Sequence, residues 1–441
     1  MFKKILIANR GEIAVRVIRA CRELGIATVA VHSQADTTAR HVRFADEAVC
    51  IGPDAPAKSY LNIPQLIAAA EITGADAVHP GYGFLSENAD FADICNACGL
   101  TFIGPTSKNM AQWGDKVQAR RLAKKLGLPM MEGSVVLRDA DDAAEQAVRV
   151  GLPVMLKASG GGGGRGMKII RSAEEMRRAF PQAQAEAVAG FNNGDLYCER
   201  YVERPRHIEF QVLADGKGKV WVLGERECSI QRRHQKLVEE APSVAVSAEL
   251  RGDMTETIKR AMRDSDYVSA GTIELLMDEK GNLAFMEMNT RIQVEHPVTE
   301  IVTGVDLIME QIRIAAGRSP DLPEEIPLVG HAVEIRMNAE DPDTFAPWPG
   351  LITELIMPGG SGIRVESGIY SGFRVPGCYD SLLAKLIGYG PTRLDAIRRL
   401  RRALDETVVG GIRTNLPLHR RILDHPTFLE GALSTRFLEE M

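Results

Sequence analysis

The sequence lacks any run of about 18 apolar residues, the length that a membrane-spanning helix requires. Its apolar start, Ile5 to Ala8, is too short for a secretory signal. Its seven cysteines are odd in number and scattered, which indicates neither a disulfide framework nor a zinc site. The lone Cys95-x-x-Cys98 motif lies on the apolar side of an expected helix, so we expect its thiols to be buried. These absences predict a cytoplasmic protein with no membrane partner.

A strong charge of either sign is also missing. The net charge is −6 and the isoelectric point is about 5.9, which argues against a nucleic-acid partner but allows a local cationic pocket for a small anion. Aromatic residues make up only 5% of the chain, whereas its 41 glycines exceed the roughly 7% average. With 45% hydrophobic and 25% charged residues, the 441-residue chain is typical of a globular protein of about three domains.

The first hundred residues alternate apolar strand patterns with helical patterns, which predicts a parallel, doubly wound sheet. After a strand at Lys3–Ile7 comes a helix with Ile13 and Val17 on its apolar face and Glu12 and Arg16 on its polar face. The turn between them carries the single glycine Gly11. A dinucleotide-binding turn needs G-x-G-x-x-G, so the pattern does not favour NAD.

The rest of the chain indicates a different architecture. A linker helix is expected at Asp115–Leu126, followed by a hairpin whose strands lie at 152–157 and 167–170. From residue 206 onward, longer strands in an antiparallel pattern are expected, and a last region from about Gly330 mixes strands with a basic helix. The expected strands are His207–Leu213, Val220–Gly224, Gly271–Met277 and Leu283–Met288, and the expected helix is Ala396–Leu404.

The surplus glycine gathers in the expected hairpin turn, where Gly160 to Gly164 and Gly166 lie between Lys157 and Lys168. The run lacks G-K-[ST] and precedes a strand, so it is not a P-loop. Glycine backbone amides can approach an anion closely, and ordering them costs much conformational entropy. We therefore expect a loop that closes over a phosphate-bearing ligand. The alternative is a passive surface hairpin.

A second motif alternates polar and apolar residues from Glu287 to Glu295. If this segment is extended, its five polar side chains share one face, opposite Met286, Met288, Ile292 and Val294. Carboxylate and amide oxygens at Glu287 and Asn289 suit Mg²⁺, and Glu274 in an apolar strand could join them. Arg291 can bind a planar anion, and Glu295 could act as a nearby base. The alternative is a solvated strand face.

A charged segment from Glu225 to Glu240 contains Arg232, Arg233, His234 and Lys236 within five positions. Alone, such a run is usually a solvated surface. Next to a phosphate loop and a carboxylate wall, it predicts a cradle for anions. Together the three motifs indicate an ATP site without a P-loop.

These motifs resemble the ATP-grasp superfamily, and within it the biotin carboxylase family, over essentially the whole chain. The resemblance rests on residues 7–14, 79–88, 157–167, 226–242, 286–297 and 331–340. It implies an α/β and α+β fold: a Rossmann-like domain (1–114), a linker helix and ATP-grasp lid (115–203), a central ATP-grasp domain (204–330) and a C-terminal domain (331–441). It also implies a homodimer.

The resemblance assigns roles to individual residues. Lys116 and Lys157 would bind ATP phosphates, and the remaining expected ATP contacts are Gly162, Gly163, Gly164, Glu199, Val202, His207, Gln231 and His234. The metal ion, Mg²⁺ or Mn²⁺, would be held by Glu274, Glu287 and Asn289. Bicarbonate would be bound by Lys236, Arg291, Gln293, Val294 and Glu295. Biotin would lie against Tyr82 and Arg336. The expected catalytic residues are Glu295, Arg291, Arg336 and Lys236.

The implied reaction begins when Glu295 removes the proton of bicarbonate, which then attacks the γ-phosphate of ATP. Carboxyphosphate breaks to CO₂ and phosphate, the phosphate deprotonates biotin, and Arg336 stabilises the enolate. The sequence differs from the usual family pattern at Trp113, Arg200, Ile335 and Trp348, which removes no catalytic group.

The sequence has no Ala-Met-Lys-Met biotinylation motif before its end at Met441, so we expect a separate biotin carboxyl carrier protein and carboxyltransferase subunits as partners. The carboxyltransferase would choose the final acceptor. Acetyl-CoA is the commonest pairing; pyruvate, 2-oxoglutarate and other acyl-CoA esters remain alternatives. Two rival functions are another ATP-grasp ligase that forms an acyl- or carbamoyl-phosphate, and a nucleotide-binding regulatory subunit.

Overall fold

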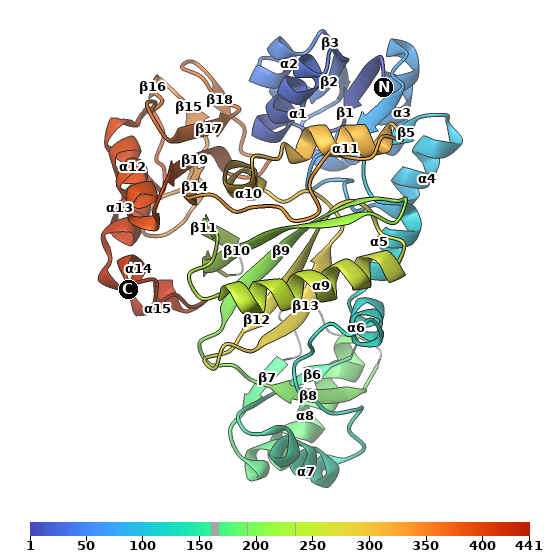
Figure 1. Cartoon of the computed structure of the whole chain (residues 1–441), viewed down its shortest axis with the longest axis vertical. Coiled ribbons are helices and arrows are strands. Elements are labelled where there is room, and N and C mark those ends of the chain that lie inside the picture. Colours follow the sequence, from blue (N-terminus) through green and yellow to red (C-terminus); the bar gives the residue numbers. More distant parts are fainter. Residues whose placement is uncertain (160–166, 192, 234) are drawn as a thin grey trace.

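The computed structural model describes residues 1–159, 167–191, 193–233 and 235–441. Three regions surround a central antiparallel sheet, and one of them projects as a separate lobe (Figure 1). None of the helices in these described ranges is both long and apolar enough to cross a membrane.

The N-terminal region is a parallel sheet, as predicted, with the strand order β3-β2-β1-β4-β5. The sequence patterns missed one of its five strands, Glu47–Gly52 at the edge of the sheet. In the central strand, Ile5, Leu6 and Ile7 are all fully buried, because helices cover both faces of the sheet. The strands are β1 (Lys4–Ile7), β2 (Ala27–Ser33), β3 (Glu47–Gly52), β4 (Ala77–His79) and β5 (Thr101–Phe102). The helices are α1 (Gly11–Glu23), α2 (Arg40–Phe44), α3 (Ile63–Thr73), α4 (Ala89–Ala97) and α5 (Ser107–Gly114), with short 3₁₀ turns η1 (Gln34–Asp36) and η2 (Pro56–Lys58).

Two expectations for this region are wrong in detail. Glu12 and Arg16 on the polar side of α1 are buried, because later parts of the chain cover that side and Arg16 pairs with Glu300 at 3.0 Å. In the Cys95-x-x-Cys98 motif only Cys95 is buried. Cys98 follows the last residue of α4, beyond the buried face of the helix, and is exposed.

The projecting lobe is the predicted hairpin with a third strand. β6 and β7 pair antiparallel with Lys157 opposite Met167, and β8 completes the sheet on the other side of β6. The lobe comprises β6 (Val154–Ala158), β7 (Met167–Ile170), β8 (Leu196–Arg200), α7 (Ala140–Val150) and α8 (Ala173–Phe191). The predicted linker helix is α6 (Lys116–Lys125), which Asp115 caps. The glycine run at 160–164, including Gly162, Gly163 and Gly164, lies outside the described residues.

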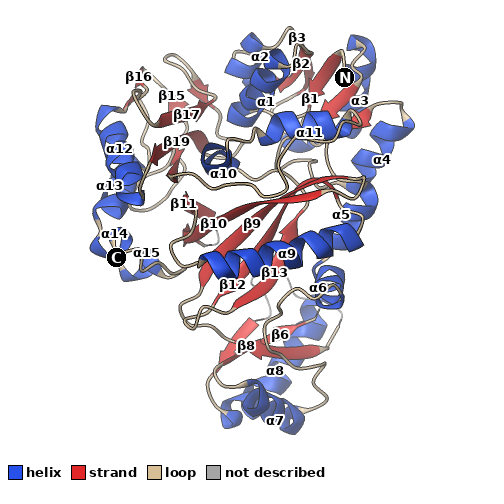
Figure 2. Ribbon diagram, in the orientation of Figure 1, coloured by secondary structure: helices blue, strands red, loops and turns tan. Residues whose placement is uncertain are grey.

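The central sheet has eight strands in the order β13-β12-β9-β10-β11-β14-β19-β17, and α9 lies across part of one face (Figure 2). It crosses the expected boundary near residue 330, since β11 pairs with β14. The strands are β9 (Arg206–Asp215), β10 (Val220–Arg232), β11 (Gln235–Ala241), β12 (Val268–Met277), β13 (Leu283–Asn289), β14 (His331–Asn338), β17 (Ile363–Ser367) and β19 (Leu382–Gly390).

Helices and two small strand pairs complete the chain. The helices are α9 (Ala248–Asp264), α10 (His296–Thr303), α11 (Leu307–Ala315), α12 (Arg393–Glu406), α13 (Leu416–Asp424), α14 (Pro426–Leu429) and α15 (Phe437–Glu440). The pairs are β15 (Gly350–Leu351) with β18 (Arg374–Val375), and β16 (Glu354–Ile356) with β20 (Val408–Gly410). Apolar residues of α12 and α13 pack with those of β14 and β19 in one cluster.

Most of the charged segment after Gly224 is buried and not solvated, whereas Arg233 and Gln235 at its turn are exposed. β10 continues through it to Arg232, beyond the predicted end, and forms a hairpin with β11. Glu225, Arg226 and Glu227 are each at most 1% exposed. Charges can be buried in this way only because each has a partner of opposite charge.

The predicted extended run from Glu287 to Glu295 is also wrong in part. β13 ends at Asn289, and Glu295 stands at the N-cap of α10, where Pro297 favours the start of a helix. A register shift within β13 pairs Glu274 with Glu287 but Leu275 with Phe285, which leaves Met286 without a partner. Met286 therefore lines the same cavity as Glu287 instead of the opposite face.

The unusual residues of the sequence are accommodated away from the site's charges. Trp113 is 1% exposed and its ring lies 6.2 Å from that of Phe285. Ile335 is fully buried in the cluster beneath α12. Trp348 is 42% exposed, and the guanidinium group of Arg413 lies over its ring. Arg200 lies 3.7 Å from Asp278.

Candidate active site

A cavity of about 2000 Å³ opens where the N-terminal, central and C-terminal regions and the lobe meet. Predicted site residues from distant parts of the sequence share its wall. They are Tyr82, Lys116, Lys157, His207, Gln231, Lys236, Glu274, Glu287, Asn289, Arg291, Gln293, Val294 and Arg336. The predicted His234 lies outside the described residues.

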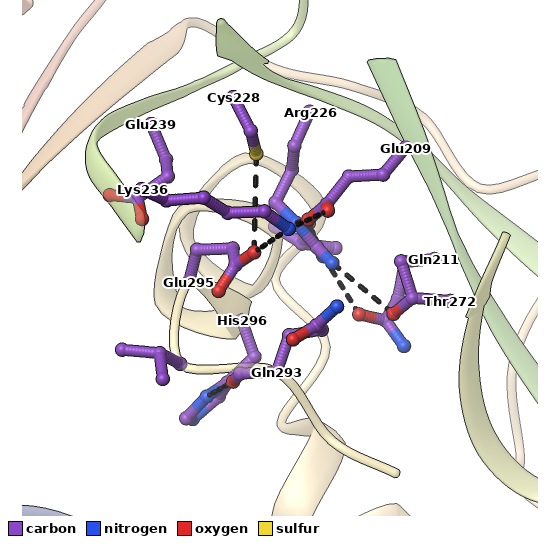
Figure 3. Close-up of polar contacts among 12 residues, drawn as sticks. Glu209, Gln211, Arg226, Cys228, Lys236, Glu239, Thr272, Gln293, Glu295 and His296 are labelled. Atoms are coloured by element: carbon purple, nitrogen blue, oxygen red, sulfur yellow. Dashed lines mark hydrogen bonds and ion pairs between the residues drawn. The ribbon is translucent and has the colours of Figure 1, made fainter. Parts of the chain in front are cut away.

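Lys236, near the start of β11, is at the centre of the charged wall (Figure 3). Its Nζ donates to Glu274 Oε1 at 2.9 Å, to Glu295 Oε1 at 2.6 Å and to Glu209. Burial alone would lower the pKa of Lys236, but the three carboxylates hold it well above its usual range. The side chain is therefore a permanent cation.

Glu295 lies between two cations at the start of α10 and is fully buried. Its Oε1 accepts from Lys236, and its Oε2 accepts from Arg336 Nη2 at 3.0 Å. Burial would raise the pKa of Glu295, but Lys236, Arg336 and Arg226 together hold it well below the usual range. The carboxylate is ionised, the state that a proton acceptor requires.

Two residues of this wall were missed from the sequence. Arg226 is fully buried and donates to Glu209 at 2.5 Å, to Gln211 at 2.7 Å and to Thr299 at 2.9 Å. Glu209 thus joins Arg226 to Lys236 (Figure 3). A signal was present: His207, Glu209 and Gln211 alternate on one face of a strand whose other residues between 207 and 214 are apolar.

The predicted metal ligands face one another across two strands. Glu274 on β12 is directly opposite Glu287 on β13. Besides Lys236, Glu274 Oε1 accepts from Asn289 Nδ2 at 2.8 Å and Gln293 Nε2 at 2.9 Å. Burial would raise the pKa of Glu274, but Lys236 and His207 lower it strongly, and the carboxylate stays ionised.

This wall suits a hard divalent cation, because its donors are carboxylate and amide oxygens. Glu287 would be one of its ligands. Within the described ranges, the only ion pair of Glu287 is with Lys116, at a long distance of 3.4 Å. Two compact groups of potential ligands also occur here, His207 with Glu209 and Glu274, and Glu209 with Cys228 and Glu295. Each shares two carboxylates with Lys236, so its charge is already balanced by an ammonium.

Arg291 forms a fork of polar contacts beside this wall. Its Nε donates to Glu87 at 2.9 Å, Nη1 to Gln293 at 2.7 Å and Nη2 to Asn289 at 3.1 Å. Val294, the next predicted bicarbonate contact, lines the cavity. The five predicted bicarbonate residues, Lys236 and Glu295 among them, thus lie close together.

The predicted phosphate lysines lie at the lobe side of the cavity. Lys157 on β6 pairs with Glu199 on β8 at 2.5 Å, and Arg120 pairs with the same carboxylate. Lys116 begins α6 and is 65% exposed along its side chain. Val202, just after β8, is half-buried and does not line the cavity, whereas Tyr201 beside it does.

Arg336 and Tyr82 close the opposite end. Arg336 Nε donates to Glu239 at 2.6 Å, a contact that the sequence did not predict. Burial raises the pKa of Glu239 to about 7 against the opposing effect of Arg336. The Tyr82 hydroxyl donates to Glu12 on α1.

Comparison with known families supports this geometry over nearly the whole chain. Residues 1–110 match the biotin carboxylase N-terminal domain, residues 115–323 match the ATP-binding domain of the carbamoyl-phosphate synthase L chain, and residues 334–440 match the biotin carboxylase C-terminal domain.

Individual relatives match from end to end. The chain is 55% identical to a biotin carboxylase of Nostoc sp. over 443 aligned positions, covering 100% of this chain and 99% of that protein. It is 51% identical to the 2-oxoglutarate carboxylase small subunit of Hydrogenobacter thermophilus, covering 100% and 94%. The crystal structure of the biotin carboxylase domain dimer of the Hydrogenobacter thermophilus enzyme, with MgADP, ADP and bicarbonate, matches with a TM-score of 0.90 and 50% identity, covering 100% and 98%.

Proposed function

Because this chain belongs to the biotin carboxylase family, we propose that its cavity carboxylates biotin with ATP and bicarbonate, and that the residues around Lys236 divide the reaction as follows. The observation that carries the assignment is the buried, ionised Glu295 held between Lys236 and Arg336. A carboxylate in that state can receive a proton, while the two cations favour an anion beside it.

In this proposal Lys236, Arg291, Gln293 and the Val294 backbone bind bicarbonate, and Glu295 takes its proton. The resulting dianion attacks the γ-phosphorus of ATP and ADP leaves, with Lys116 and Lys157 binding the phosphates. Glu274, Glu287 and Asn289 would hold Mg²⁺, which neutralises phosphate charge when bound. Glu199, Val202, His207 and Gln231 complete the nucleotide contacts, together with His234 and the glycine run.

Carboxyphosphate then breaks to CO₂ and phosphate. The phosphate takes the ureido proton of biotin, the nitrogen attacks CO₂, and Arg336 stabilises the enolate oxygen while Tyr82 lies near the ring. Positive charge already placed at a developing anion requires no reorganisation during the step.

We further propose that the chain works as a homodimer in the cytoplasm, with the domain division 1–114, 115–203, 204–330 and 331–441. A dimer of the Hydrogenobacter thermophilus domain supports the first point. A biotin carboxyl carrier protein and carboxyltransferase subunits would be the partners. Acetyl-CoA is the acceptor that we favour, and identification of the carboxyltransferase that co-purifies with the chain tests this choice.

The reaction is tested by ATP hydrolysis in the presence of Mg²⁺ and bicarbonate, with and without free biotin. Stimulation by biotin is expected. Bicarbonate-dependent hydrolysis that ignores biotin would favour another ATP-grasp ligase, and no hydrolysis at all would favour a regulatory nucleotide-binding subunit. Omission of bicarbonate is the control for contaminating ATPases.

A further inference from the structure

A fully buried lysine, Lys385 on β19, lies beneath the bicarbonate residues and takes no part in the proposed reaction. Its Nζ donates to the backbone oxygen of Val294 at 2.7 Å. The same Nζ lies 3.2 Å from Glu12 Oε1, on α1 of the N-terminal region. Three segments that are distant in sequence therefore meet at one ammonium group.

The contacts continue beyond Glu12. Its Oε1 also accepts from the Tyr82 hydroxyl, which belongs to the loop after β4. The carboxylate is only 2% exposed. An unbroken series of polar contacts, each at least partly buried, therefore runs from Tyr82, on the biotin side of the cavity, through Glu12 and Lys385 to Val294, on the bicarbonate side.

The charge of Lys385 is balanced by Glu12 rather than by its other neighbours. Glu334 faces the same region from β14, but its carboxyl group is buried without a hydrogen-bond partner among the residues described. Burial raises the pKa of Glu334 well above its usual range, more than Lys385 lowers it, which favours the uncharged form of this carboxyl group. Arg336, opposite Lys385 across β14 and β19, pairs with Glu239 and Glu295.

A buried ion pair of this kind is weak support for stability, since apolar residues of similar size often serve as well. Such a pair instead fixes the position of its partners, because hydrogen bonds to charged groups are stronger than neutral ones and hold their partners in one geometry. Here the ammonium holds the carbonyl of the peptide that joins Val294 to Glu295, the residue proposed to accept the proton.

We propose that Lys385 and Glu12 are positioning residues that couple the bicarbonate side of the cavity to the biotin side. This inference rests on the proposed function. Lys385 holds the Val294–Glu295 peptide in place, and Glu12 holds Lys385 and Tyr82 together. A shift at either end is therefore transmitted to the other through two shared side chains.

The first test replaces Lys385 by methionine, which keeps the length of the side chain and removes its charge. Loss of a hydrogen bond to a charged group typically changes a binding constant about tenfold or more. We expect K385M to raise the KM for bicarbonate about tenfold or more in ATP hydrolysis without biotin, while the KM for ATP stays within about twofold. The matched control is K259M: Lys259 on α9 is also mostly buried and ion-paired, with Glu256, but no hydrogen bond among the described residues joins it to the bicarbonate residues.

The second test looks for coupling at a distance. The variant Y82F removes only the hydroxyl that bonds Glu12, yet it should raise the KM for bicarbonate when biotin is absent. The effects of Y82F and K385M combined should be smaller than the product of the two, because both break the same series of contacts. The double variant E12Q/K385M leaves no unpaired buried charge, so it tests the same loss should K385M fold poorly.

The outcomes separate the two proposals. A wild-type chain without biotin-stimulated hydrolysis would overturn the proposed function and this coupling with it. A wild-type chain with that activity, together with K385M and E12Q/K385M variants whose KM for bicarbonate equals that of K259M, would overturn the coupling alone. So would a Y82F variant with an unchanged KM for bicarbonate.

Discussion

Replacing Glu295 by glutamine separates a proton acceptor from a structural carboxylate. Glutamine has the same size and keeps one oxygen that can accept hydrogen bonds, but it cannot take the proton of bicarbonate. Loss of a general base typically costs about 10²–10⁴-fold in rate. We therefore expect kcat of the E295Q variant to fall by that factor, while the KM for ATP stays near its wild-type value, since Glu295 does not contact the predicted ATP residues.

The same change should also cost stability. Because the folded-state pKa of Glu295 lies below its unfolded value, its contribution is fully present above about pH 4.3 and is lost as pH falls through the folded value. Breaking a buried ion pair costs about 3–5 kcal/mol. We expect the low end at pH 7, because Lys236 keeps Glu209 and Glu274, and Arg336 keeps Glu239.

Glu240 offers a matched control. It is also buried and paired, with His331 at 2.8 Å and Arg393 at 2.6 Å, but neither partner is a predicted bicarbonate or biotin residue. The variant E240Q should lose a similar amount of stability, measured by urea unfolding, while kcat stays within about threefold. If E295Q hydrolyses ATP as fast as E240Q does, with bicarbonate and biotin present, Glu295 is not the base and the assignment fails.

Three further predictions concern the same wall. E287Q should raise the Mg²⁺ concentration for half-maximal hydrolysis about tenfold or more, and an unchanged Mg²⁺ titration would exclude Glu287 as a ligand. Glu239 stabilises the fold below about pH 4.3, and this contribution is lost as pH rises through its folded pKa of about 7. Urea unfolding of E239Q should therefore show its stability relative to wild type rising by up to about 3 kcal/mol from pH 4 to pH 8, and a fall would contradict the burial argument. The R226M variant should be less stable than wild type by about 3 kcal/mol or more, because the buried carboxylate of Glu209 loses one of its two cationic partners. An unchanged midpoint of urea unfolding would contradict this prediction.

The sequence was sufficient where a local pattern decides the structure. Alternation of apolar strands and helices predicted the N-terminal parallel sheet, and the glycine run predicted the β6–β7 hairpin around it. The period-two motif predicted the cavity wall correctly for Glu287 and Asn289. It was wrong at the bulge of Met286 within β13 and about an extended chain after β13, because the bulge and the N-cap at Glu295 depend on the neighbouring strand and helix; Arg291 and Gln293 nevertheless line the cavity.

Pairing in three dimensions was beyond the reach of sequence patterns. The alternation around Glu209 marks it as a polar residue of an apolar strand, but it does not indicate that Arg226 is its partner, or that Lys385 reaches Glu12 across more than 300 positions. These contacts depend on how the eight-stranded sheet brings β19 beside β14 and how α1 packs against it. A charged run therefore looks like a solvated surface until its partners are located.

The cations proposed to bind anions are already paired with carboxylates in this structure. Lys236 contacts three, Arg336 two, and Arg291, Lys157 and Lys116 one each among the described residues. Substrate anions must therefore exchange with these carboxylates instead of entering a free positive pocket. Such exchange favours anions that make several contacts at once, because a single weak contact cannot offset the loss of a buried ion pair.

Two of those carboxylates have a second proposed role. Glu274 balances Lys236 and Glu287 balances Lys116, and the same two residues are the proposed metal ligands. A carboxylate that shares its charge with a divalent ion attracts a lysine less strongly, since the charge is divided between them. With Mg²⁺ held there, the two lysines would be available to bicarbonate and phosphate. The facing pair Glu274 and Glu287 thus controls how available Lys236 and Lys116 are to substrate anions. This second role explains why the wall contains more acidic residues than a metal site alone would need.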